Sequence, residues 1–248
     1  MSKLIKAEWY RFTHSGIMFK VLVFLSFFSL LMHYVSDPKF MERTLCANMI
    51  TYTSVLGVTL CMFLGTVIAA TLGVFYNNRT GFYEIMDGSS PSEIILSKLI
   101  VYVPSSVVAI FVPMGILSAV VYIKNGAGEG LNLPIYYSMV LVKVVHIISI
   151  VVFATLIFKS LLGAAIPYIR FLIFEVMGFE MLIMALPHNE TIRNIAHCFP
   201  AYQISYSLNN LSGDCGELVL KFIISFVVEI PLLYIITYVG YKKKWFIK

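Results

Sequence analysis

Six long apolar stretches constrain how this chain can fold. They lie near 17–35, 51–75, 94–123, 135–158, 161–186 and 218–240. A helix needs about 20 apolar residues to cross the hydrocarbon of a bilayer. Backbone polar groups inside hydrocarbon must bond within the segment, which favours helices for such stretches. Hydrophobic residues make up 59% of the chain and charged residues 12%, which is unlike a soluble domain. The sequence therefore predicts an all-α polytopic membrane protein, with residues 1–248 forming one six-helix bundle.

The positions of the basic residues predict how the bundle is oriented. One side has Lys3, Lys6, Arg11, Lys20, Arg79, Lys98, Lys159, Lys242, Lys243, Lys244 and Lys248, and the other has Lys39, Arg43, Lys124 and Arg193. Cytoplasmic segments carry the excess of Lys and Arg. We therefore expect a multi-pass protein of the plasma membrane with both termini in the cytoplasm. The formal net charge of +5 follows from this bias, and nothing in the pattern indicates a nucleic-acid partner.

The first residues have the periodicity of an amphipathic helix. In 2–14, Ile5, Trp9 and Phe12 fall on one face, and Lys3, Lys6 and Tyr10 fall on the other. Trp and Tyr favour the headgroup level of a membrane. We expect an interfacial helix here, although a plain basic flank of the first span fits the same periodicity. The apolar stretch that follows is too long for a signal-peptide core, so the first span is expected to be retained.

One polar stretch, 76–98, separates the second and third apolar runs. Ser90, Pro91 and Glu93 have the spacing of a capping box, which predicts a helix that begins at Pro91. Upstream, 80–87 can form a short amphipathic helix closed by Gly88, because glycine tolerates the left-handed conformation that ends helices. A short surface helix followed by a sharp restart into the bilayer is a shape on which a partner can push.

The remaining segments give weaker predictions. The helix from Pro91 to Ile123 would be roughly 50 Å long, and its Pro104 and Pro113 predict a kink. The glycine-rich 126–130 is expected to be a flexible external turn. Segment 187–216 is too polar for a span and too apolar for a free loop, so we expect short external helices half-buried in the outer leaflet. A disulfide between Cys198 and Cys215 remains open.

Ionisable residues inside the spans are the best candidates for a specific role. They are Lys143, Arg170, Glu175, Glu180 and Glu229. Such groups face a bundle interior or a cavity, because a charge is costly in hydrocarbon. Counting about 1.5 Å per residue predicts two pairs, Arg170 with Glu229 and Lys143 with Glu175, and places Glu180 near the outer surface. Pairing is favoured over substrate contact, and both remain open.

Motifs for catalysis or metal binding do not stand out. The chain has no GxxxxGK[ST] phosphate loop, so it cannot hydrolyse ATP by the usual P-loop route. His188 and His197 lie near Glu190 in the sequence, but their spacing matches no metal-binding pattern. We predict no catalytic residue, no metal site and no cofactor bound by this chain.

Three segments in this order resemble a known family. They are the opening KLIKAEWYRF with Ala7, Glu8 and Arg11, the loop with Arg79, Gly81 and Glu84 followed by PSEIILSK from Pro91 to Lys98, and IAHCFPAYQI around Pro200. Together they resemble the small permease subunits of ABC type 2 exporters, particularly those that protect Gram-positive bacteria against lantibiotics and bacitracin-like peptides. The resemblance covers the whole chain.

The resemblance implies roles for three parts of the chain. Residues 2–14 would be a connecting helix, 80–87 a coupling helix, and 187–216 the external helices over the exit path. The coupling residues would be Arg79, Phe82, Tyr83, Glu84, Ile85 and Met86. The partners would be two ATPase subunits that hold the ATP and Mg, a second permease chain that is identical or homologous, and membrane lipid. Phe199 and Tyr202 are candidates to line the path of an amphipathic peptide or lipid-like compound, or else to seal the bundle.

Two other classes of function remain open. An ion-coupled secondary transporter would use the same intramembrane charges, but the sequence shows no internal repeat. An intramembrane enzyme would use Glu175 and Glu180 with His146, but residues five apart lie about 140° apart on an α-helix.

Overall fold

The structure is a computed structural model that describes most of the chain. It describes residues 1–14, 16–36, 39–52, 58–77, 84, 87–158, 165, 169–197, 199 and 216–242. Throughout these residues the regular structure is helical, without a β-strand. The all-α prediction is therefore confirmed for the described chain.

Eleven helical elements are described along the chain. They are α1 (Ser2–His14), α2 (Ile17–Ser36), the 3₁₀ turn η1 (Phe40–Glu42), α3 (Leu45–Tyr52), α4 (Val58–Asn77), α6 (Pro91–Asn125), α7 (Leu133–Phe158), the π-helix η3 (Ile169–Gly178), α9 (Phe179–Ala185), α10 (Glu190–Ala196) and α12 (Gly216–Lys242). The predicted spans 17–35, 94–123, 135–158 and 218–240 each coincide with one helix. Within the predicted span 51–75, α3 ends at Tyr52 and α4 begins at Val58, and 53–57 lie outside the described residues.

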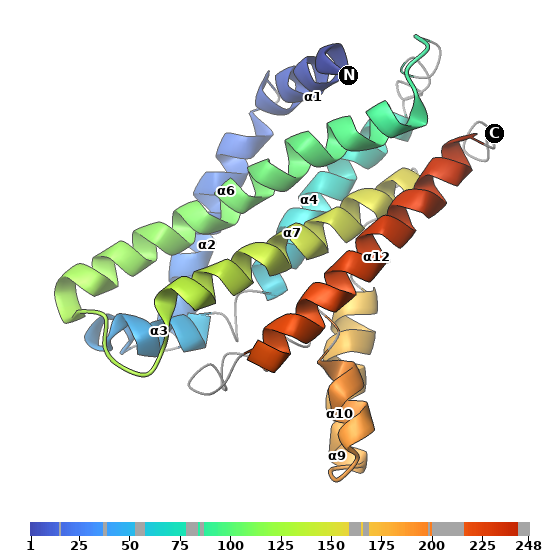
Figure 1. The fold of residues 1–248 in the computed structure, drawn as a ribbon. Coiled ribbons are helices and arrows are strands. Elements are labelled where there is room, and N and C mark those ends of the chain that lie inside the picture. Colours follow the sequence, from blue (N-terminus) through green and yellow to red (C-terminus); the bar gives the residue numbers. More distant parts are fainter. Residues whose placement is uncertain are drawn as a thin grey trace.

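Helix α7 is the centre of the bundle. It packs against α4, α6 and α12, while α2 and α1 pack against α6. Figure 1 shows α6, α7 and α12 side by side, with α1 and the last turn of α12 at the same end of the molecule. Ile147, Val152 and Phe153 of α7 have no exposed surface. Helix α4 approaches α7 closely at Gly65, because glycine has no side chain there. An added Cβ would lie only 3.0 Å from the Val151 side chain.

Two of the described helices are long and apolar enough to cross a membrane by themselves. They are α6 and α7. A third span results if α1 and residues Phe19–Phe28 of α2, whose axes meet at an angle of 56°, are taken together as one broken span. Large apolar side chains on the rim of the bundle, such as Phe27 of α2 and Val228 of α12, are more than half exposed. An apolar rim is expected where lipid replaces water as the solvent. These features support a membrane protein.

The start and the length of α6 agree with the sequence. Ser90 is the N-cap, its hydroxyl accepts from the Glu93 N–H at 3.3 Å, and the Ser90 N–H donates to the Glu93 carboxylate at 3.1 Å. This is the predicted capping box. The helix then continues for 35 residues through Pro104 and Pro113, which is about 52 Å at the rise of an α-helix.

The loop at 126–130 differs from the predicted flexible turn. The carbonyls of Gly126 and Ala127 accept from the N–H groups of Leu45 and Cys46 at 3.1 and 2.9 Å. The first N–H groups of a helix have no partner within it, so this loop completes the start of α3. Gly128 has φ +77°, and a Cβ there would lie 2.5 Å from the Thr44 hydroxyl. The glycines are therefore required by a close contact and a left-handed backbone.

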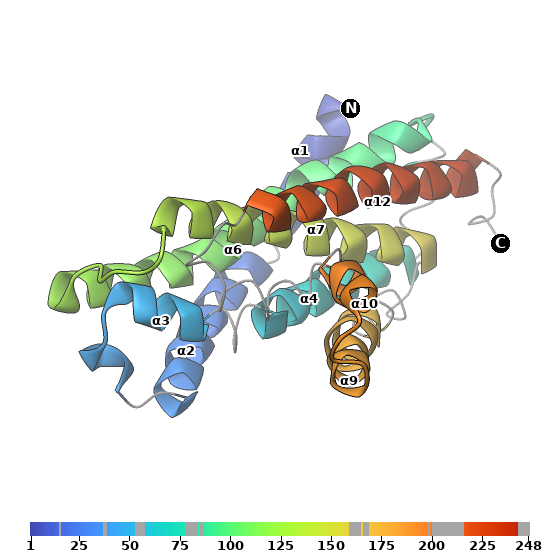
Figure 2. The same cartoon turned by 60° about the horizontal axis from the view of Figure 1, so that its bottom comes forward.

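The predicted fifth span, 161–186, is not one straight α-helix. Its described part consists of η3 and α9, which project away from the layer of α6, α7 and α12 (Figures 1 and 2). Helix α10 then packs back against α9. It is a short helix in the predicted external segment. The Asn189 side chain caps its start by accepting a hydrogen bond from the Ile192 N–H at 3.2 Å. Cys198, Cys215 and Tyr202 lie outside the described residues.

Candidate functional site

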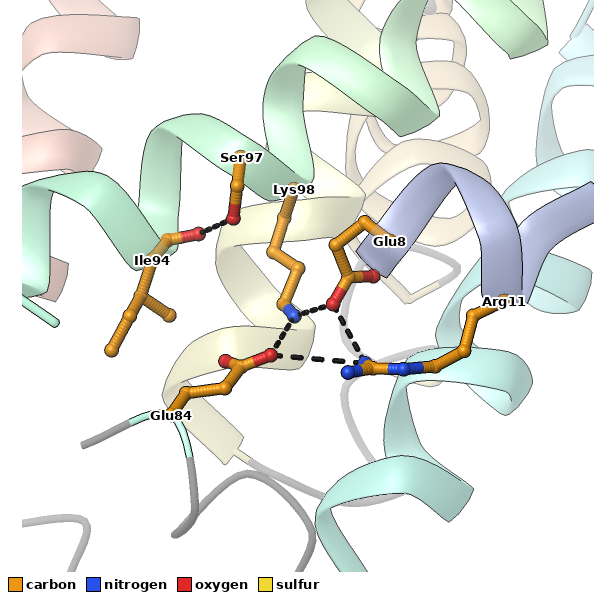
Figure 3. Close-up of polar contacts among 6 residues, drawn as sticks. All are labelled: Glu8, Arg11, Glu84, Ile94, Ser97 and Lys98. Atoms are coloured by element: carbon orange, nitrogen blue, oxygen red, sulfur yellow. Dashed lines mark hydrogen bonds and ion pairs between the residues drawn. The ribbon is translucent and has the colours of Figure 1, made fainter. Parts of the chain in front are cut away.

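A cluster of charged side chains joins three segments at the end of the bundle where α6 begins. Glu8 and Arg11 come from α1, Lys98 from the second turn of α6, and Glu84 from the polar stretch between α4 and α6 (Figure 3). We call these four residues the charge cluster. It brings together positions up to 90 residues apart in sequence.

Lys98 is the centre of the charge cluster. Its side chain has no exposed surface, and its ammonium group donates to Glu8 Oε1 and, at 2.7 Å, to Glu84 Oε1. Glu8 is 1% exposed and Glu84 5% exposed. An isolated charge with so little access to water would be strongly destabilising. The ammonium group therefore depends on both carboxylates.

Arg11 covers the cluster from the side open to solvent. Its guanidinium donates to Glu8 Oε1 at 2.7 Å and lies 3.7 Å from Glu84 Oε1. The guanidinium carbon also lies 4.1 Å from the centre of the Phe75 ring, and the Lys98 nitrogen lies 4.8 Å from the same centre. The ring face attracts both cations. Phe75, at the end of α4, thus connects a fourth element to the cluster.

Glu84 is helical and lies four residues before Gly88. The Ser89 N–H donates to the Glu84 carbonyl at 3.3 Å, and Gly88 has φ +78°. This bond and this backbone conformation are marks of a Schellman helix end. They support the predicted end of the short helix 80–87. Arg79, Phe82, Tyr83, Ile85 and Met86 lie outside the described residues.

The cluster contains two carboxylates and two cations, so its formal charges cancel. Burial nevertheless disfavours the ionised form of Glu84. Oxygen Oε2 of Glu84 and of Glu8 is buried without a hydrogen-bond partner among the described residues. Burial raises the pKa of the Glu84 carboxyl above its ordinary value, and the neighbouring Lys98 opposes this. The neutral form of Glu84 is therefore favoured by folding relative to the unfolded chain.

A cleft of about 780 Å³ lies beside the cluster, between α1 and the segment that leads into α6. Lys3, Ala7 and Arg11 line one wall, and Glu84, Asp87 and Glu93 line the other. The Glu93 carboxylate accepts hydrogen bonds from the Met1 amino group and from the N–H and hydroxyl of Ser90. These bonds lower the pKa of Glu93 to about 2, and the bond from Met1 has the largest effect. Among the described residues, no group of three His, Cys, Asp or Glu side chains could hold a metal ion.

The sequence analysis missed Glu8 and Lys98 as partners. Both could have been found by their spacing: Glu8 lies on the same helical face as Ile5 and Phe12, and Lys98 lies on the face of Ile94, Val101 and Tyr102. A charge on the apolar face of a helix must find an opposite charge. Glu84, a predicted coupling residue, is 5% exposed, and its carboxylate accepts a hydrogen bond from Lys98.

A second group of charges lies midway along α7 and α12. Arg170 of η3 donates through both terminal nitrogens to the Glu229 carboxylate, with NH2 at 3.0 Å from Oε2. The Nε2 atom of His146 lies 3.0 Å from the same carboxylate. The depth count correctly predicts the Arg170–Glu229 pair, and His146 is an additional member that it missed. We call His146, Arg170, Glu175 and Glu229 the midplane network.

The predicted pairing of Lys143 with Glu175 stays a prediction, and the structure adds a partner for Glu175 that the sequence did not predict. Glu175 accepts from Arg170 Nε at 2.7 Å, while Lys143 is buried in α7 at 3% exposure. The depth count assumed an α-helix, where residues 170 and 175 would lie about 140° apart. The i→i+5 bonding of the π-helix η3 brings such residues close to the same face. Both carboxylates can therefore share one guanidinium.

The other predicted positions do not converge on one site. Glu180 is exposed on α9, and its predicted depth near the outer surface of the membrane stays a prediction. The ring of Phe199 lies 5.0 Å from that of Phe179 at the start of α9. His197 is buried and His188 is exposed.

The comparisons with known proteins give no relative. No protein-family model matches the chain, and no curated protein or solved structure is similar to it. The geometry of the two charge groups is therefore the evidence from which a function can be argued.

Replacing Lys98 with methionine should destabilise the fold strongly. It leaves the Glu8 and Glu84 carboxylates buried with only Arg11 beside them, and breaking a buried pair in this way costs about 3–5 kcal/mol. Lys124→Met is the matched control, because Lys124 is exposed at the other end of the same helix and should change stability by about 0.5 kcal/mol or less. Thermal unfolding in detergent measures both. Equal midpoints would show that Lys98 is not the centre of the cluster.

The stability difference between the wild type and Glu84→Gln should depend on pH. Because the pKa of Glu84 is raised in the folded state, its contribution to stability is fully present below its ordinary pKa of 4.5 and is lost as the pH rises through the folded value. Glutamine does not titrate. The unfolding midpoint of the wild type should therefore fall relative to that of the variant as the pH rises above about 4.5. A constant or widening advantage of the wild type would contradict the raised pKa.

A double-mutant cycle tests the midplane network. Arg170→Leu leaves two carboxylates without their shared guanidinium and should cost about 3–5 kcal/mol. Glu229→Leu should cost less, because Arg170 keeps Glu175. The double variant should be less damaged than the sum of the single variants, as measured by folded yield in detergent. Strict additivity would mean that the two side chains do not pair.

Proposed function

We propose that this chain is the transmembrane subunit of an ATP-driven ABC exporter. It works in the plasma membrane as a multi-pass protein with cytoplasmic termini, paired with a second permease chain, identical or homologous, and with two ATPase subunits. Its substrates are antimicrobial peptides or other amphipathic, lipid-like compounds, whose removal from the membrane gives resistance. The ATP and Mg are bound by the ATPase subunits.

One observation carries this proposal: the charge cluster ties the polar stretch before α6 to both α1 and α6. Glu84 is held by Lys98 of α6, and Lys98 also holds Glu8 of α1. A force applied to the segment around Glu84 is therefore transmitted to two helices. Since α6 packs along α2 and α7, a displacement at its start reaches the interior of the bundle. A buried ion-pair group suits this link, because partial separation of its charges is costly.

The burial of Glu84 supports a division of roles within the coupling segment. Because Glu84 is buried, it acts as the anchor of the coupling segment, and the residues on either side of it would form the docking surface. The cleft beside the cluster opens next to Asp87 and Gly88. The position of α1 and the last turn of α12 at one end of the molecule supports termini on one side of the membrane (Figure 1).

The other two classes of function receive different support. An ion-coupled transporter is favoured by one observation, the contact of His146 with Glu229, since a histidine beside a carboxylate is suited to proton transfer. An intramembrane enzyme has less support: Glu175 is buried against Arg170, whereas Glu180 is exposed on the next helix. Those carboxylates do not face a common reaction centre.

A proline at Ile85 tests the coupling segment and keeps all four charged side chains of the cluster in the sequence. Proline removes a backbone donor and breaks a helical turn. The amount of ATPase that co-purifies with tagged Ile85→Pro should fall by about tenfold or more, a loss of about 1.4 kcal/mol of binding, while its folded yield stays near that of the wild type. Lys124→Met, at the opposite end of α6, should retain the ATPase. Charge reversal at Glu84 is a poorer test, because it would place a third cation beside Lys98 and Arg11.

Two results would overturn the proposal. One is nucleotide-independent transport by the purified chain in vesicles, which would favour the ion-coupled transporter if it followed an imposed proton gradient. The other is full ATPase binding and drug resistance in Ile85→Pro cells, which would show that this segment does not couple the two subunits.

A further inference from the structure

Helix α1 has an outward face against which no other described helix packs, although Lys3 at its edge also lines the cleft beside the charge cluster. The face turned toward α6 contains Glu8 and Phe12, both buried. The opposite face exposes Lys3, Lys6, Trp9, Tyr10 and His14, and we call this the outward face of α1. This arrangement differs from the predicted one, because Trp9 lies with the lysines and Phe12 packs edge-on against Tyr102 of α6 at 5.4 Å.

The outward face has cations without carboxylates. Glu8 is the single acidic residue of α1, and it is turned inward and neutralised by Lys98. Of the nearby acids, Glu84 is buried in the cluster, and Glu93 bonds the Met1 amino group. Asp87 lies across the cleft, on the opposite wall. Lys20, exposed at the start of α2, adds a further positive charge beyond the end of α1.

Two aromatic side chains stand among these cations. Trp9 is 53% and Tyr10 60% exposed, and the Tyr10 ring stacks on His14 at 3.6 Å. Rings with one apolar body and one polar group prefer the headgroup level of a bilayer. An acidic protein surface would be matched by the lysines alone and would leave these rings unexplained. The combination of exposed lysines and exposed aromatic rings fits a negatively charged lipid surface.

We propose that the outward face of α1 binds the headgroups of anionic phospholipids in the leaflet that it touches. Lys3 and Lys6 lie close to the lipid phosphates, and Trp9 and Tyr10 reach into the boundary of the acyl chains. Each lysine near an anionic surface strengthens binding by about fivefold. Through Glu8 and Lys98, the helix that contacts these lipids is the same helix that fixes the start of α6. The inference needs a membrane and not an ATPase, so its failure would leave the proposed function untouched.

Fluorescence of Trp9 in the full-length chain tests the inference. The sequence has two tryptophans, so Trp245→Phe leaves Trp9 as the reporter. The chain is placed in nanodiscs that contain equal amounts of phosphatidylglycerol and phosphatidylcholine, with bromine on the acyl chains of one lipid or the other. Brominated phosphatidylglycerol should quench Trp9 at least about twofold more than brominated phosphatidylcholine. This preference should disappear in Lys3→Gln/Lys6→Gln and persist in the control Lys124→Gln, whose charge lies at the far end of α6.

Three outcomes of the quenching experiment would overturn the lipid-binding inference. Equal quenching by both lipids, or a preference that survives the loss of Lys3 and Lys6, overturns the inference. Quenching by neither lipid also overturns it and indicates that protein covers this face. If Trp245→Phe does not fold, the same experiment compares Lys3→Gln/Lys6→Gln with the wild type. The contribution of Trp245 then cancels in the difference.

Discussion

The buried ammonium group of Lys98 is the interaction on which one end of the molecule depends. A lysine without access to water needs negative partners close by, and Glu8 and Glu84 provide them from two other segments. Because Lys98 must contact both carboxylates, Glu8 of α1 has to face α6, and Glu84 has to lie beside the first turns of α6. The same geometry turns Lys3, Lys6 and Trp9 outward. The coupling and lipid-binding proposals therefore concern opposite faces of one helix.

The midplane network applies the same physical rule between other helices. Arg170 holds Glu229 of α12 and Glu175 of its own helix, and His146 of α7 reaches the same Glu229. The π-helical backbone of η3 makes the double contact possible, because it brings residues five apart toward one face. Buried charges on η3, α7 and α12 thus lie against one another. The network links η3, which projects from the bundle, to α7 and α12.

The two ends of α6 are organised by different interactions. Its start depends on the capping box of Ser90 and Glu93 and on the charge cluster. Its end is held by backbone hydrogen bonds, in which the carbonyls of Gly126 and Ala127 complete the start of α3, and by the Asn125 amide, which donates to the carbonyls of Met41 and Arg43 at 2.7 and 2.8 Å. A force applied at the first end would act on a helix whose other end is anchored.

The sequence by itself determined the helices and many of their boundaries, because hydrophobic length, capping residues and glycine act locally. The capping box at Ser90, the end at Gly88 and the length of α6 needed no tertiary information. The depth of Arg170 and Glu229 also followed from counting, because helical rise is regular. Only the tertiary structure decided that Glu8 and Lys98 complete the cluster with Glu84, and that the 126–130 loop packs on α3. Their partners lie far away in the chain, and the choice among possible opposite charges depends on how the helices pack. The contact of Arg170 with Glu175 was not predicted, because counting assumed an α-helix, whereas the π-helix η3 changes which residues share a face.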